Sequence, residues 1–130
     1  MNGQNQMGTE NLQMIGKTQD GPASDVVAVA DPVARYVVEA IATQLRPEKV
    51  YLFGSRASGR ANSESDVDVL LIYDGHESHR DIRLKTHRLF PNPTFSLDVF
   101  VQSSKEFDAQ KRVANTLARE VMERGILCHG

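Results

Sequence analysis

The amino-acid sequence predicts a single α/β (α+β) domain, in which a small mixed sheet carries helices packed on one side. Short apolar runs typical of strands alternate with segments whose apolar residues recur at helical spacing. Their order is helix, strand, short turn-helix, strand, helix, strand, helix, which is typical of this class. The chain has 130 residues, enough for one core and too few for a second large domain. Residues 1–25 are polar, so we expect a disordered or loosely docked tail before a domain at 26–130.

Composition limits the compartment and the partners. Apolar residues make up 40% of the chain and charged residues 25%, as in ordinary soluble proteins. The formal net charge of −2 gives no overall attraction to nucleic acid, so direct nucleic-acid binding is not expected. The single cysteine, Cys128, cannot form an internal disulfide, and no apolar run reaches the roughly 20 residues of a membrane span. We therefore expect a cytoplasmic protein without a membrane partner.

The first helix and the first strand have clear boundaries. Asp31 is a good N-cap and Pro32 suits the first helical position, where its missing N–H costs nothing. Apolar residues at helical spacing continue the helix to about residue 45, and Pro47 ends it. A strand follows at Lys49–Phe53, and a turn then leads into a short helix near residues 56–60.

The second half of the chain repeats the pattern of capped helices and short strands. Ser78 with Asp81 resembles a capping box for a helix that ends near Leu89. Arg80, Arg83 and His87 lie on one face of this helix, which we interpret as a solvated or partner-facing surface.

An alternating strand is predicted at residues 94–101. Ser103 with Glu106 then predicts the start of one long amphipathic helix that ends before Gly125. A short edge strand is expected at residues 126–128.

Three aspartates on two strands point to a metal site. Asp66 and Asp68 are two residues apart at the second strand, so both carboxylates project from one face and repel each other unless a cation is bound. Asp98 lies on the next strand, and all three can converge if the two strands are neighbours. A small set of hard oxygen ligands suits Mg²⁺, and the glycine in the preceding Gly54-Ser55 turn would allow phosphate to approach the backbone.

A zinc site at His76 and His79 is not expected, because no third soft ligand is near.

These residues resemble a known signature. Gly54-Ser55, ten residues and then Asp66-Val67-Asp68 are similar to the GS, ten-residue spacer, DxD motif of the DNA polymerase β nucleotidyltransferase superfamily. The short chain and the GSRA start resemble the minimal nucleotidyltransferase (MNT) proteins over about residues 31–128. Ser58 departs from the pattern, where a basic residue is more usual, and so does Val69, where leucine is commoner.

The resemblance implies the nucleotidyltransferase fold and specific roles for the site residues. Asp66 and Asp68 are implied to bind two Mg²⁺ ions, and Asp98 to bind one of them and help to activate the acceptor hydroxyl. Gly54 and Ser55 are implied to hold the triphosphate of ATP. Arg56 is either a further phosphate contact or a surface arginine.

The chain contains no segment for binding an acceptor, so we expect a hetero-oligomer in which a partner completes the site. MNT proteins are often paired with HEPN toxins, which implies a protein adenylyltransferase that moves AMP from ATP to a toxin tyrosine and so acts as an antitoxin. One alternative is a non-catalytic antitoxin that binds its toxin by steric contact. Another is a nucleotidyltransferase that acts on a small molecule or on RNA.

Overall fold

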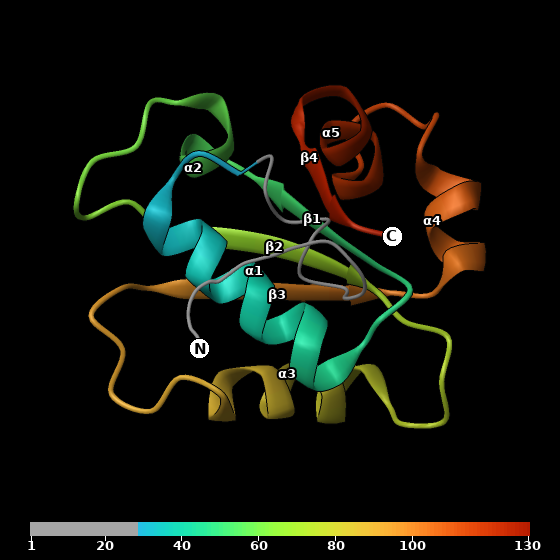
Figure 1. Ribbon diagram of the computed structural model, residues 1–130. Helices are drawn as coiled ribbons and strands as arrows, with labels where there is room; N and C mark the ends of the chain where they lie inside the picture. Colours follow the sequence, from blue (N-terminus) through green and yellow to red (C-terminus); the bar gives the residue numbers. More distant parts are fainter. Residues whose placement is uncertain (1–28) are drawn as a thin grey trace, which may run out of the picture.

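The computed structural model describes residues 29–130, and the predicted tail at 1–25 lies outside them (Figure 1). The elements follow the predicted order, except that two helices replace the single long helix expected near the end of the chain. They are α1 (Pro32–Leu45), β1 (Lys49–Phe53), α2 (Ser55–Ser58), β2 (Val67–Ile72), α3 (His79–Arg88), β3 (Leu97–Gln102), α4 (Ser104–Gln110), α5 (Leu117–Arg124) and β4 (Ile126–His129). No helix in this part of the chain is long and apolar enough to cross a membrane.

The strands form one mixed four-stranded sheet in the order β3-β2-β1-β4. β1 pairs antiparallel with β2 and β4, while β2 and β3 are parallel. The helix α3 makes the crossover between the parallel pair, as such a connection requires. β4 confirms the edge strand expected near the end of the chain. The α/β class and the mixed sheet are thus confirmed.

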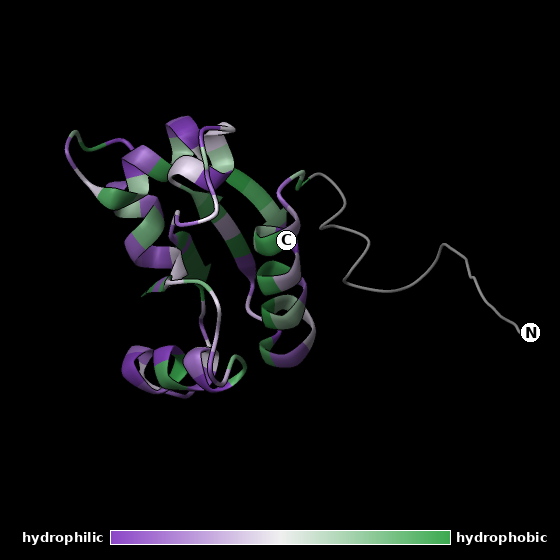
Figure 2. Ribbon diagram, turned by 90° about the vertical axis from the view of Figure 1, so that its left-hand side faces the viewer, coloured by the Kyte–Doolittle hydropathy of each residue, from purple (hydrophilic) through white to green (hydrophobic). Residues whose placement is uncertain are grey.

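Helices cover both faces of the sheet, which corrects the prediction that they pack on one side. Val50 and Leu52 of β1 face a core formed with α1 and α3. Tyr51 and Phe53 face a second core formed with α4 and α5. Figure 2 shows the apolar residues of α1 turned towards the sheet. The physical reason is that β1 and β2 are apolar on both faces, so each face needs a covering layer.

The helix α1 has the predicted boundaries. Oδ1 of Asp31 accepts hydrogen bonds from the N–H groups of Val33 and Ala34, both at 3.0 Å. Arg46 takes a left-handed conformation after the last turn, and Pro47 follows. Asp31 therefore has a defined position at the start of α1, where it also lines a cavity next to α2.

The prediction of one long C-terminal helix from Ser103 onwards is wrong, because the structure has two helices there. The capping box of Ser103 and Glu106 does start α4, but the helix ends at Gln110. Asn115 has a φ of 67°, and Thr116 caps α5 by accepting from the N–H of Arg119 at 3.1 Å. Asn tolerates the left-handed region, and the hydroxyl of Thr116 competes for backbone partners, so the chain bends there. This bend gives α5 its own direction over β1 and places Glu120 near the acidic site.

Candidate active site

Three carboxylates converge at one end of the parallel strand pair. Asp68 of β2 is the register partner of Asp98 of β3, and Asp66 precedes β2 by one residue on the same face. Each of the three can offer a carboxylate oxygen within 4.8 Å of the others. The predicted convergence is therefore confirmed, and its cause is the parallel register, which places equivalent residues side by side.

The crowding of the three carboxylates has its largest effect on the pKa of Asp68. The pKa of Asp68 is raised to about 6, first by partial burial, then by the hydrogen bond and charge of Asp98, and last by the charges of Asp66 and Glu120. A protonated Asp68 donates a hydrogen bond to Asp98, which explains the direction of that contribution. The three groups cannot all stay ionised at low cost without a cation.

Glu120 is the one member of this environment that sequence reasoning missed. It lies on α5, far from the other acids along the chain, in an unremarkable helical pattern. Only the packing of α5 against the sheet brings it within electrostatic reach of Asp68.

Gly54 brings the backbone of the turn against Asp68. Its φ of 78° and ψ of −161° belong to a region that only glycine adopts easily. A Cβ at this position would collide with Oδ2 of Asp68 and lie 3.2 Å from its Cγ. Glycine at position 54 thus lets the main chain of the turn lie closer to the carboxylate cluster than it could with any residue that has a Cβ.

The turn then opens α2, whose first residue is Ser55. The carbonyl of Gly54 accepts from the N–H of Ala57 at 3.1 Å and from that of Ser58 at 3.2 Å. The earlier N–H groups, of Ser55 and Arg56, cannot find partners inside so short a helix. Donors of this kind next to a cation site suit phosphate oxygens.

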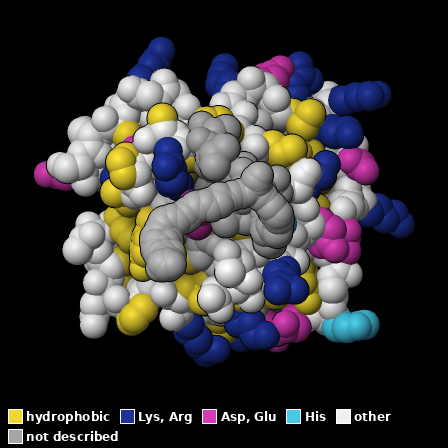
Figure 3. Space-filling model, in the orientation of Figure 1, with side chains coloured by type: hydrophobic (Ala, Val, Ile, Leu, Met, Phe, Trp, Pro, Cys, Tyr) yellow, Lys and Arg dark blue, Asp and Glu magenta, His cyan; other side chains and the backbone are white. Residues whose placement is uncertain are grey.

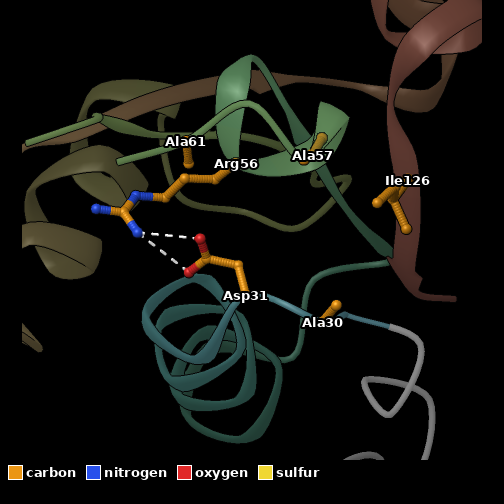
Figure 4. A pocket seen from close by; sticks show the side chains of 7 residues that line it. Ala30, Asp31, Arg56, Ala57, Ala61 and Ile126 are labelled. Atoms are coloured by element: carbon orange, nitrogen blue, oxygen red, sulfur yellow. Dashed lines mark hydrogen bonds and ion pairs between the residues drawn. The ribbon is translucent and has the colours of Figure 1, made fainter. Parts of the chain in front are cut away.

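The side chain of Arg56 is buried, and it pairs with an acid outside the three-carboxylate cluster. Its side chain is 5% exposed, and Nη1 forms an ion pair with Asp31 at 3.1 Å (Figure 4). Nε donates to the carbonyl of Ser65 at 3.0 Å. Asp31 caps α1 on the face of the sheet opposite Asp68, so the guanidinium holds α1, α2 and the following loop together. A direct nucleotide contact by Arg56 stays a prediction.

The ion pair lines a cavity of about 300 Å³ with Ala30, Ala57 and Ile126. Figure 4 shows these apolar side chains to one side of the paired groups. The cavity lies on the α1 side of the sheet, away from the three carboxylates.

The basic surface predicted on the third helix is present on α3. Arg80, Arg83 and Arg88 are exposed and have no ion pair within residues 29–130, whereas Lys85 pairs with Glu77 at 2.6 Å. Figure 3 shows Lys and Arg side chains gathered along the lower edge, where α3 runs in Figure 1. The surface remains open to solvent or to an acidic partner.

Residues 34–128 match the family described as "Nucleotidyltransferase domain". The chain belongs to this family. The match spans all four strands up to Cys128 and nearly all of both cores of the nucleotidyltransferase domain. No curated protein sequence matches the chain.

Several solved protein chains resemble the nucleotidyltransferase domain. One of them is a crystal structure at 1.40 Å resolution of a protein from Sulfolobus solfataricus that is named as a candidate nucleotidyltransferase. The identity is 23%, with 86% of this chain and 90% of that chain covered, and the TM-score is 0.46. The family assignment rests on the match to residues 34–128 and not on this likeness.

The donor set of the nucleotidyltransferase domain fits the divalent metals that such domains usually use. Three carboxylates with oxygens within 4.8 Å can share a small hard cation. Burial is the main cause of the raised pKa of Asp68, and repulsion by the neighbouring carboxylates adds to it. A cation would relieve the same repulsion that raises this pKa.

Proposed function

We propose that this nucleotidyltransferase transfers AMP from ATP to a tyrosine hydroxyl of a HEPN-type toxin and acts as its antitoxin. The observation that supports the transfer most strongly is the register pairing of Asp68 with Asp98 beside the half-buried backbone of Gly54. It combines a cation site with a phosphate-binding turn, which are the two parts that nucleotidyl transfer needs.

The residues of the chain have separate roles in the proposed reaction. N–H groups at the Gly54-Ser55 turn donate to phosphate oxygens of ATP. Two Mg²⁺ ions held by Asp66, Asp68 and Asp98 would neutralise phosphate charge and favour ionisation of the acceptor hydroxyl. The Asp98 carboxylate takes the proton of that hydroxyl. The freed oxygen bonds to the α-phosphorus, the bond from this phosphorus to the β-phosphate oxygen breaks, and pyrophosphate leaves with the electron pair.

The open side of the site supports an acceptor on another molecule. β3 is an edge strand, and Asp98 lies exposed on it. Within the described residues, no further domain stands over this edge. The resemblance to MNT proteins then favours a HEPN toxin as the molecule that presents the hydroxyl.

The transfer is tested with labelled ATP, Mg²⁺ and the purified HEPN partner. We expect the label on a partner tyrosine with the wild type and none with Asp66→Asn plus Asp68→Asn. Asp81→Asn, an exposed acid on α3, is the matched control and should label normally. Equal labelling by the double variant would refute the catalytic role of the carboxylates.

The same variants separate catalysis from steric neutralisation. If the double variant still inhibits the ribonuclease activity of the partner, the chain acts as a binding antitoxin. If the wild type labels RNA or a small hydroxyl compound and not the partner, the enzyme has a different acceptor.

A further inference from the structure

An exposed aromatic ring lies beside the carboxylates. Phe100 of β3 is 41% exposed and shares the face of Asp98, two residues earlier on the strand. Its register partner on β2 is Leu70, which is fully buried. Phenylalanine is among the residue types most often buried, so the exposed ring of Phe100 beside the carboxylates offers apolar surface that the ring of a ligand can cover.

The ring is held in place by a second aromatic residue. Phe53 of β1 packs against Phe100 with ring centroids 5.8 Å apart and an angle of 50° between the rings. Phe53 is also the register partner of Asp68. The two rings therefore meet over β2, directly beside Asp68. Together they form an aromatic surface next to the carboxylates.

The position of Phe100 is on the acceptor side of the proposed reaction. Gly54 follows β1, on one side of β2, whereas Asp98 and Phe100 lie on β3, on the other side. Attacking and leaving oxygens stand in line on opposite sides of the transferred phosphorus. If the pyrophosphate leaves towards Gly54, the acceptor arrives over β3 and over Phe100.

We propose that Phe100 determines acceptor specificity by stacking on the aromatic ring that carries the acceptor hydroxyl. This inference rests on the proposed function and adds the residue that selects a phenol over an aliphatic alcohol. Along a strand, Phe100 lies about 6.6 Å from Asp98, and stacked or tilted rings have centroids about 4.5–7 Å apart. A phenol ring seated on Phe100 can therefore direct its hydroxyl along the strand to Asp98. A serine side chain has no surface to fill this gap.

Steady-state kinetics with N-acetyltyrosinamide and N-acetylserinamide as acceptors test the assignment. For Phe100→Ala we expect the KM for the tyrosine compound to rise roughly three- to tenfold, as for loss of an aromatic pair, while the KM for ATP stays within about twofold. Phe100→Trp keeps a ring and should stay close to the wild type. Leu127→Ala removes an equally exposed apolar side chain, 44% exposed, at the opposite edge of the sheet, and should change neither value.

The assignment is overturned if Phe100→Ala leaves the KM for N-acetyltyrosinamide unchanged, or if the variant loses both acceptors equally. A wild type that adenylylates no acceptor, including the partner, refutes the proposed function instead.

A binding measurement decides the assignment without turnover. The chain contains no tryptophan, so Phe100→Trp introduces a single reporter at the site. We expect N-acetyltyrosinamide to change its emission, and N-acetylserinamide at the same concentration to leave it unchanged. A change produced by a non-hydrolysable ATP analogue with Mg²⁺, and not by the tyrosine compound, would mean that the nucleobase stacks there and would overturn the proposal.

Discussion

Asp68 and Asp98 lie opposite each other in the parallel register of β2 and β3, and a protonated Asp68 donates a hydrogen bond to Asp98. The pair is therefore a proton-binding site in the absence of metal and a cation-binding site in its presence. The stability of the folded protein and its affinity for metal therefore both depend on the Asp68 and Asp98 carboxylates.

Asp68→Asn should stabilise the metal-free protein near neutral pH. Burial and the neighbouring carboxylates raise the pKa of Asp68 to about 6, against about 3.9 in an unfolded chain. Protonation of Asp68 thus favours the folded state below about pH 4, and this contribution is lost as the pH rises through 6. After allowance for solvent screening, we expect a gain of roughly 1 kcal/mol or less at pH 7.5. Thermal unfolding in EDTA measures it.

The advantage of Asp68→Asn over the wild type should shrink between pH 6 and pH 4. An advantage that is constant with pH would show that the substitution acts by another route than the charge of Asp68.

Mg²⁺ should raise the Tm of the wild type and should have little effect on Asp66→Asn plus Asp68→Asn. A ligand that binds only the folded state stabilises it by about 2.7 kcal/mol at one hundred times its Kd. A Mg²⁺ titration followed by thermal unfolding tests this, with Asp81→Asn as the control that keeps the wild-type response. An equal rise in Tm for the double variant would place the metal elsewhere.

Gly54→Ala should damage the site more than Gly59→Ala. Both glycines have positive φ, 78° and 80°, but a Cβ on Gly54 collides with Asp68, while a Cβ on Gly59 meets nothing within 4 Å. We expect Gly59→Ala to cost about 1–2 kcal/mol from its backbone conformation, and Gly54→Ala to cost more. Urea unfolding and the Mg²⁺ response measure both. If the collision matters, adding Asp68→Ala to Gly54→Ala should restore part of the lost stability.

Arg56→Met should lower stability and change the KM for ATP by less than about twofold. The guanidinium is buried against Asp31, and removal of one partner of a buried pair costs about 3–5 kcal/mol, less here because Asp31 is 17% exposed. Asp31→Asn keeps an N-cap and removes only the charge, so a double-mutant cycle isolates the ion pair. A large rise in the KM for ATP with unchanged stability would instead identify Arg56 as a phosphate contact.

Cys128 should not react with thiol reagents in the folded protein. Burial raises the pKa of its thiol to about 11, and only the thiolate is nucleophilic. Titration with Ellman's reagent at pH 8 should show one reactive thiol in denaturant and none before unfolding. Rapid reaction of the native protein would mean that β4 opens readily at the sheet edge.

Local sequence signals predicted the elements that depend on near neighbours along the chain. Asp31 with Pro32, and Pro47, set the limits of α1, because caps and proline act within one turn. Alternation along the strands predicted that Asp66 and Asp68 share a face. The spacing of Gly54-Ser55 from these acids also indicated the family to which residues 34–128 belong.

Packing between distant segments decided the rest. The second core, the bend at Asn115 and Thr116, and the approach of Glu120 to Asp68 all depend on how α4 and α5 settle on the sheet. Arg56 followed a phosphate-binding pattern in the sequence, yet its guanidinium is bound to Asp31, twenty-five positions earlier. The sequence by itself therefore identified the three aspartates and the Gly54-Ser55 turn as the site. Charge pairing and burial act through space between distant segments, so only the tertiary structure decided which residues surround that site.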